Sequence, residues 1–411
     1  MSAPDQQLTR RAVLGGVGCL CCAGVPGIAH ALQRVSPAAM QPLIGPGHRP
    51  TDEDERGMWQ QYERVEQEIA GSNLLIKDPA LTSYLSGLGE RVGGPAARDL
   101  RVYLARVPEF NAFMAPTGFM VVFSGLLTRT RDEAQLSGVI AHEAGHFLRR
   151  HHIRHWRDLK RRTDGLTALA VAMGLGGIAT GTNFGNAYGL ARMGTILSMA
   201  AYSRGIEAEA DAMGVRLMAE SGLDPTAMPE IWQQLIGEAE ESARLRRRRP
   251  RRGTSLLSTH PAPKDRMQDL RLSAAEVRSA SRSYERGKER YLSALGTHRK
   301  DLLDELVKLN DPGTSLYIIR SLSADGWNGL LRFYQGEIWR LRGQKGDAER
   351  AATSFAQAVA FPDAPAEAWR AHGQALLRAG HREEGRRALA RYLELAPGAP
   401  DAAMVRQQVG S

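Results

Sequence analysis

Cysteine is nearly absent from this chain of 411 residues, which has only three. All of them, Cys19, Cys21 and Cys22, lie close to the amino terminus. Cleavage after Ala31 would remove them. The remaining chain then needs no disulfide, and no thiolate can bind its metal or take part in its chemistry.

Long apolar runs are also lacking. The apolar, glycine-rich stretch after Arg10 and Arg11 is too short for a comfortable membrane span. It ends near Ala29-His30-Ala31, and together these features predict a secretory signal of the twin-arginine type over residues 1–31, followed by a linker over 32–49. We therefore expect the protein in the periplasm. A lipid anchor at one of the cysteines is the alternative, which the residues before them fit poorly.

A second apolar stretch, residues 166–178, is also short for a transmembrane helix. Its glycines favour a core helix followed by a flexible loop. A mobile flap over a cleft and a shallow membrane contact are the alternatives.

Aromatic residues make up only 6% of the chain, and none interrupts the arginine run between Arg244 and Arg252. Despite a formal net charge of +9, this absence argues against a nucleic-acid interface. We interpret the run as a solvated loop, with attraction to an anionic membrane surface as the alternative. Hydrophobic and charged contents of 43% and 24% are typical of a soluble globular chain, and the length predicts two domains.

The most informative segment that is present is His142-Glu143-Ala144-Gly145-His146. On a helix, residues four apart lie on one face, roughly 5 to 6 Å apart at Cβ, so both imidazoles can reach one ion at about 2.0 to 2.1 Å. Glu143, about 100° round the helix, falls beside the ion and can act as a general base. This is the spacing of a catalytic zinc site. An ordinary polar helix with two surface histidines is the alternative.

The start of this helix is predicted at Thr130, whose side chain would form a capping box with Glu133. Beyond the motif, the basic segment 151–162 is expected to continue the helix onto the surface. Its histidines, His151, His152 and His155, would then face solvent.

A catalytic zinc site needs a third protein ligand, and Glu207 is the candidate. Asp211 shares its helix face and can hydrogen-bond the distal nitrogen of His142 or His146. Glu209 is expected to point elsewhere on that helix. Without the histidine motif, a solvated acidic face would be the simpler interpretation.

Two other regions have recognisable periodicity. Residues 102–104 and 119–123 are predicted strands, with Pro116-Thr117-Gly118 as a turn. From about residue 325, paired short helices follow a tetratricopeptide pattern, in which Gly336 and Gly373 are 37 residues apart, the usual 34 plus a three-residue insertion. A chance helical hairpin is the alternative.

The histidine motif, followed some sixty residues later by Glu207-x-x-x-Asp211, resembles the gluzincin metallopeptidases of family M48. Three further features narrow the resemblance to the family's soluble periplasmic BepA type. They are the segment from Asn111-Ala112-Phe113 through Pro116-Thr117-Gly118 to Ser124-Gly125-Leu126-Leu127, the segment Ser258-Thr259-His260-Pro261 followed by Arg266, and the carboxy-terminal repeats. The resemblance implies that the edge of the small sheet binds an extended peptide as an additional strand.

The role of His260 stays open at this point. In the family type that the chain resembles, the similar histidine can occupy the open position of the zinc and hold the enzyme inactive. A histidine that binds substrate or the transition state, and a simple loop residue, are the alternatives. Tyr202 and Arg266 are candidates for stabilising the transition state.

We therefore predict a mainly α (α+β) protein that binds one zinc ion through His142, His146 and Glu207. A gluzincin domain with a small sheet would cover residues 50–280, connecting helices 281–324 and tetratricopeptide-like repeats 325–411. The resemblance implies an endopeptidase acting on misfolded or stalled outer-membrane proteins, with the repeats recognising clients or the assembly machinery. An adaptor or chaperone with little proteolysis is the alternative, and peripheral membrane contact a weaker one.

Overall fold

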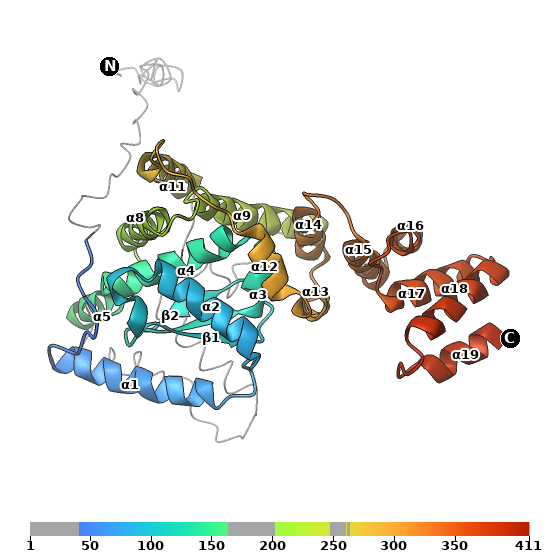
Figure 1. Ribbon diagram of the computed structural model, residues 1–411, viewed down its shortest axis with the longest axis horizontal. Helices are drawn as coiled ribbons and strands as arrows, with labels where there is room; N and C mark the ends of the chain where they lie inside the picture. Colours follow the sequence, from blue (N-terminus) through green and yellow to red (C-terminus); the bar gives the residue numbers. More distant parts are fainter. Residues whose placement is uncertain (1–40, 163–201, 247–259, 261–263, 411) are drawn as a thin grey trace, which may run out of the picture.

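The computed structural model describes residues 41–162, 202–246, 260 and 264–410 (Figure 1). The predicted signal over residues 1–31, the apolar stretch 166–178 and most of the arginine run lie outside these residues.

Three short strands form one mixed sheet in the order β1-β3-β2. They are β1 (Arg101–Ala105), β2 (Ala112–Met114) and β3 (Phe119–Phe123). Strand β3 pairs parallel to β1 and antiparallel to β2, and both strands predicted from the sequence are confirmed. In the turn between β2 and β3, Gly118 has a φ of 90°, which favours glycine, and its N–H donates to the carbonyl of Ala115 over 3.0 Å.

Helices cover both faces of this sheet (Figure 1). Those of the first 280 residues are α1 (Glu53–Ala70), α2 (Pro79–Val92), the 3-10 helix η2 (Gly94–Asp99), α3 (Ser124–Arg129), α4 (Glu133–Leu148), α5 (His151–Arg162), α8 (Arg204–Glu220), α9 (Ala227–Arg246) and α11 (Lys264–Val277).

The apolar sequence of β3 follows from this double cover. Met120 and Val122 belong to the core shared with α2, α4 and α8, whereas Phe119 and Val121 pack in a second cluster with Tyr62 of α1. Because successive side chains of a strand point to opposite faces, a strand buried on both sides needs an uninterrupted apolar run.

The later helices lead away from the sheet to the carboxy terminus (Figure 1). They are α12 (Lys288–Leu295), α13 (His298–Lys308), α14 (Pro312–Leu322), α15 (Gly329–Arg342), α16 (Asp347–Val359), α17 (Ala366–Arg378), α18 (Arg382–Leu395) and α19 (Ala402–Gly410). Helix α14 packs along α9, and α13 packs on α3.

Helices α15 and α16, and then α17 and α18, form two packed pairs at the positions of the predicted repeats. A Cβ at Gly336 would lie 2.4 Å from the ring of Phe355, and one at Gly373 would lie 2.8 Å from Leu389. Glycine is therefore required for each pair to pack this closely. The tetratricopeptide assignment itself remains a prediction.

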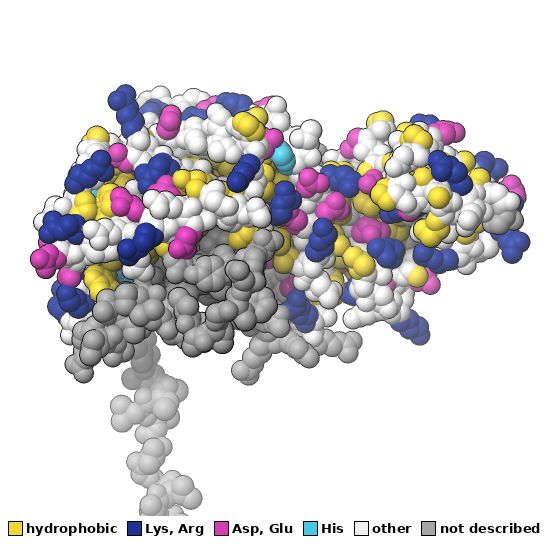
Figure 2. Space-filling view, turned by 90° about the horizontal axis from the view of Figure 1, so that it is seen from below, with side chains coloured by type: hydrophobic (Ala, Val, Ile, Leu, Met, Phe, Trp, Pro, Cys, Tyr) yellow, Lys and Arg dark blue, Asp and Glu magenta, His cyan; other side chains and the backbone are white. Residues whose placement is uncertain are grey.

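The fold class is confirmed as mainly α with a small sheet. Among the described helices, none is long and apolar enough to cross a membrane. On the face shown in Figure 2, basic and acidic side chains are interspersed over the described surface.

Candidate metal centre

Helix α4 carries the histidine motif, but its start is set by Asp132 and not by the predicted capping box of Thr130 and Glu133. Asp132 accepts a hydrogen bond from the backbone N–H of Gln135 over 2.8 Å, and the Gln135 side chain accepts one from the N–H of Arg131 over 2.9 Å. Thr130 instead donates to the carbonyl of Leu126. The N-cap of the helix is therefore Asp132, two residues later than the predicted Thr130.

The predicted continuation of this helix beyond the motif is also wrong. Helix α4 ends at Leu148, Arg150 has a φ of 53°, and α5 begins at His151. The break turns His151 inward, where its side chain is fully buried. His151 was expected to face solvent, because the basic residues that follow it made the segment look like a surface helix.

Helices α4 and α8 cross with almost no space between their backbones. A Cβ on Gly145 would lie 2.9 Å from the carbonyl oxygen of Ala210, and one on Gly214 would lie 3.0 Å from the backbone nitrogen of His142. The two glycines thus allow an approach that brings Glu207 of α8 opposite the histidines of α4.

Four side chains converge at this crossing: His142, His146, Glu207 and His260. Each offers one ligand atom, and these atoms all lie within 4.8 Å of one another. Nε2 of His142 lies 3.1 Å from Nε2 of His146. Oε2 of Glu207 lies 3.6 Å from the first of these nitrogens, and Oε1 lies 3.6 Å from the second. All four side chains are buried. The structure therefore brings together the three ligands predicted from the sequence and also His260, for which the open zinc position was one of the predicted places.

Asp211 orients His142 from behind. Its Oδ1 lies 3.0 Å from Nδ1 of His142, as predicted. Arg266 donates to both carboxylate oxygens of Asp211, over 2.6 and 2.9 Å, and its third nitrogen lies 2.8 Å from Glu207. The sequence suggested that Arg266 stabilises the transition state. These contacts instead favour a positioning role, because the guanidinium holds two carboxylates of the site in place.

His146 is oriented by residues that sequence reasoning missed. Its Nδ1 lies 2.9 Å from Nδ1 of His151, and Nε2 of His151 lies 3.3 Å from Glu209. Arg149 and Arg154 in turn bind Glu209. Glu209 does point away from the metal ligands, as expected, but it supports one of them through His151. In the sequence, the only sign of this supporting role was that Glu209 lies between Glu207 and Asp211 on α8.

These contacts test whether the site fits a metal ion. Glu209 accepts the proton on Nε2 of His151, which makes Nδ1 of His151 an acceptor for the proton on Nδ1 of His146. The carboxylate of Asp211, 3.0 Å from Nδ1 of His142, likewise favours a proton on that nitrogen, although the contact lacks the geometry of a hydrogen bond. The two Nε2 atoms then face each other across 3.1 Å, an arrangement that needs a positive charge between them, either a proton on His142 or a metal ion. Two imidazoles and a carboxylate are ligands that zinc uses, so the residues fit zinc.

The electrostatics of the site favour a cation as well. Burial alone would lower the pKa of His142, but Asp211 and Glu207 outweigh it and raise the pKa to about 9. Burial, followed by the charges of neighbouring histidines, lowers the pKa of His146 well below its ordinary value, which keeps that ring in the neutral form that binds metals. The carboxylates thus attract positive charge, and the lowered pKa of His146 keeps the lone pair of that ring available to a metal ion.

Glu143 lies between the ligands and the sheet. One oxygen accepts a hydrogen bond from the backbone N–H of Met114 over 3.1 Å. The other, Oε1, is buried without a hydrogen-bond partner among the described residues and lies 3.5 Å from Nε2 of His260. Burial raises the pKa of Glu143. An oxygen free to take a proton beside the ligand atoms is what a general base requires.

His260 and Tyr202 close the remaining sides of the centre. Nδ1 of His260 lies 3.0 Å from Glu207 and 3.3 Å from Nε2 of His142. Tyr202 stacks on His146 with ring centroids 4.4 Å apart, and its buried hydroxyl has no hydrogen-bond partner in the part of the chain that the structure describes. Both residues therefore lie within the centre that the sequence placed them in.

A His-Glu-x-x-His helix, a ligating glutamate from a second helix and an aspartate behind the first histidine define a site of the gluzincin class of zinc metallopeptidases. Comparison with known families agrees with this class. Residues 76–274 match peptidase family M48, and this part of the chain is an M48 peptidase domain.

Individual relatives come from bacteria and from mitochondria. The beta-barrel assembly-enhancing protease of Escherichia coli (strain K12) is 32% identical over 264 residues, which cover 59% of this chain and 51% of the relative. The protein of the same name from Yersinia pestis is 30% identical over 287 residues, 66% of this chain and 55% of the relative. The mitochondrial metalloendopeptidase OMA1 of Schizosaccharomyces pombe is 27% identical over 212 residues, 51% and 57% of the two chains. The chain thus spans about half the length of the curated relatives that it matches.

Proposed function

We propose that this protein is a zinc-dependent endopeptidase of the bacterial cell envelope. The observation that carries the proposal is the unpartnered Oε1 of Glu143, which is buried beside the converging Nε2 atoms of His142 and His146. A purely structural metal site has no use for a carboxylate in that position.

The residues divide the chemistry between them. When bound, zinc polarises a peptide carbonyl and lowers the pKa of a water in its coordination shell to about 7. Glu143 takes a proton from the attacking water and delivers it to the leaving amine. The hydrogen bond from Met114 fixes its other oxygen during this transfer. Strand β2 is an edge strand, and a substrate peptide can pair beside it as another strand.

The proposed resting state is one in which His260 takes the place of the attacking water. The contacts of His260 with Glu207, His142 and Glu143 support this. Replacing it by alanine is expected to increase the rate of casein cleavage at unchanged zinc content. A lower rate would instead assign His260 to the chemistry and overturn the inhibitory role.

The proposed clients are misfolded or stalled proteins of the envelope, including outer-membrane proteins. This follows from the name of the relatives, beta-barrel assembly-enhancing protease, which also suggests contact with assembly machinery through residues 325–411. A periplasmic location after export by the signal over residues 1–31 fits these clients. Contact with a membrane surface through the arginine run is a weaker proposal.

The deciding experiment is a Glu143→Gln variant assayed on denatured casein, with zinc measured by atomic emission. We expect the rate to fall by about 10²- to 10⁴-fold, because a general base is lost, while one zinc ion per chain is retained. Glu90→Gln, an exposed carboxylate on α2, is the matched control and should match the unsubstituted protein. Undiminished cleavage by Glu143→Gln would overturn the assignment.

The paired helices α15 to α18 favour a second candidate, an adaptor or chaperone that needs little proteolysis. Rescue of a deletion strain separates the two. If Glu143→Gln rescues the strain as well as the unsubstituted protein does, the helical region performs the function that matters in the cell.

A further inference from the structure

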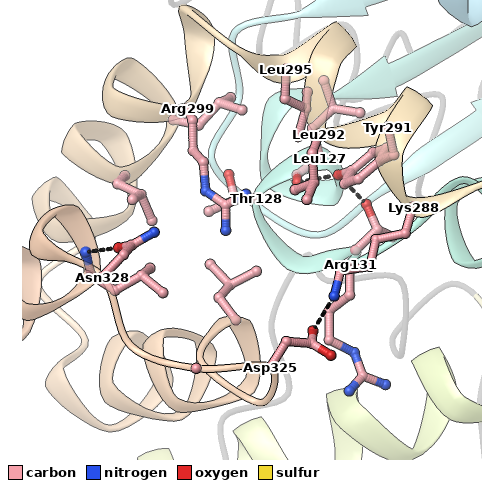
Figure 3. Close-up of a pocket in the computed structure, with 16 residues that line it drawn as sticks. Leu127, Thr128, Arg131, Lys288, Tyr291, Leu292, Leu295, Arg299, Asp325 and Asn328 are labelled. Carbon is pink, nitrogen blue, oxygen red and sulfur yellow. Dashed lines mark hydrogen bonds and ion pairs between the residues drawn. The ribbon is translucent and has the colours of Figure 1, made fainter. Parts of the chain in front are cut away.

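A cavity of about 170 Å³ lies away from the metal centre, where α3, α12, α13 and the connection from α14 to α15 meet (Figure 3). Its wall is largely apolar and is formed by the leucines Leu127, Leu292, Leu295, Leu302, Leu303, Leu322 and Leu331. It is therefore built from α3 and the residue segment that follows it, together with two later segments, 288–303 and 322–331, that are far from α3 in sequence.

Three cationic side chains line the cavity, and two of them are paired. Lys288 lies 2.6 Å from Asp325, and Arg131 lies 3.3 Å from Glu230. Arg299 has neither an ion pair nor a hydrogen bond to any described residue, and its Nε is buried without a partner. Figure 3 shows its guanidinium directed into the cavity. One positive charge in this cavity is thus left uncompensated.

Arg299 is half-buried, and its Nε is cut off from water beside leucines without receiving a hydrogen bond in return, which is unfavourable. Burial lowers the pKa of Arg299, but a guanidinium stays charged in proteins. An anion in the cavity would complement this charge, and a carboxylate matches the planar fork of an arginine with two parallel hydrogen bonds.

The size and lining of the cavity restrict what carries this carboxylate. A cavity of roughly 150 Å³ lined by apolar side chains holds a molecule the size of benzene. The space beside Arg299 thus accommodates one apolar side chain and is too small for a long acyl chain. In a polypeptide, an apolar side chain and a carboxylate share one carbon atom only at the carboxy terminus.

We propose that this cavity binds the C-terminal residue of a polypeptide, with its carboxylate on Arg299 and its apolar side chain among the leucines. The rim suits a chain that continues outward. The side-chain oxygen of Asn328 caps α15 by accepting from Leu331, which leaves its NH₂ as a donor. A Cβ on Gly326 would meet no atom within 4 Å, so a peptide can leave the cavity over this residue. This site does not depend on the proposed peptidase activity.

The test measures binding in a Glu143→Gln background, so that cleavage plays no part. The probe is a fluorescently labelled hexapeptide of glycine and serine that ends in leucine, used as the free acid and as the C-terminal amide. We expect the acid to bind at least about tenfold more tightly than the amide, since a hydrogen-bonded charge pair is lost in the amide. Arg299→Gln should reduce the affinity for the acid to that for the amide.

Lys308→Gln is the matched control, because it removes one positive charge from an exposed position on the same helix. It should leave binding unchanged, and Arg299→Lys should retain part of it. Circular dichroism checks that each variant is folded. If Arg299→Gln does not fold, the comparison of acid with amide in the unsubstituted cavity decides the question.

Equal binding of acid and amide would overturn the proposal, as would equal losses in Arg299→Gln and Lys308→Gln. Octanoate is added as a competitor to separate the two sources of an apolar carboxylate. If octanoate binds in an Arg299-dependent manner and the peptide does not, the site takes small aliphatic acids and the assignment to a polypeptide terminus is wrong.

Discussion

The metal centre and the Arg299 cavity both place charge beside apolar side chains, and they compensate it in opposite ways. At the metal centre, Arg266 contacts Asp211 and Glu207, so the chain itself supplies the partners. In the cavity, the guanidinium of Arg299 has no partner among the described residues. The charges around the metal centre are therefore paired by residues of the chain before any ligand binds. The charge of Arg299 is paired only when a ligand binds in the cavity.

The two sites also differ in how tightly their helices pack. Helices α4 and α8 meet at Gly145 with no room for one added carbon atom, whereas the cavity leaves about 170 Å³ between its helices. The metal centre therefore tolerates little change in shape. The cavity can accept an added side chain.

The largest expected effect comes from breaking the charge network of the metal centre. Arg266→Met leaves Asp211 and Glu207 buried without their cation, which should lower the free energy of unfolding by about 3–5 kcal/mol. Urea denaturation of the metal-free protein measures this. Arg271→Met, at an exposed position on the same helix, should change it by less than about 0.5 kcal/mol. Equal effects of the two substitutions would show that Arg266 does not stabilise the buried carboxylates of Asp211 and Glu207.

The second effect concerns the orientation of a ligand. In His151→Phe, Nδ1 of His146 loses its partner, and zinc affinity should fall by about 10- to 100-fold. Competition with a chromogenic chelator measures this affinity. His155→Phe is the control, since that ring packs against Tyr202 and not against a predicted ligand. Unchanged affinity in His151→Phe would mean that Asp211 and the helix crossing suffice to orient the site.

The third effect tests the packing contrast. Gly145→Ala places a Cβ 2.9 Å from the carbonyl of Ala210 and should destabilise the protein by about 1–3 kcal/mol in thermal or urea unfolding. Gly205→Ala, in the first turn of α8, meets nothing within 4 Å and should stabilise it by up to about 1 kcal/mol through helix propensity. Stabilisation by both substitutions would mean that the crossing can open.

The residues of the metal centre that are close together in the sequence could be predicted most directly. His142, Glu143 and His146 share one helical turn, so their spacing alone placed them together. Glu207 lies about sixty residues from the motif, so its prediction depended on the need for a third ligand and on the helix face that it shares with Asp211. The orientation of His146 by His151 could not be predicted, since it depends on the positive φ of Arg150, which only tertiary packing enforces.

The fold and the cavity show the same limit. The strand 119–123 was predictable because its apolar run is contiguous. Arg299 looked like any surface arginine in sequence, because its lack of a partner is a property of three segments that meet only in the folded chain. Local patterns therefore identified the metal ligands and the strands, but not the second site.

The smallest expected effect is also the sharpest test of the comparison. Arg299→Leu replaces an uncompensated charge by a residue like its neighbours, so the free energy of unfolding should stay the same or rise by up to about 1 kcal/mol. Arg332→Leu is the counterpart, because its guanidinium stacks on Trp327 at 3.6 Å and donates to Gln335. Loss of that stacking should lower the same quantity by about 0.5–1 kcal/mol. If Arg299→Leu lowered it equally, Arg299 would already have a stabilising role within the chain, and the cavity would need no ligand to complete it.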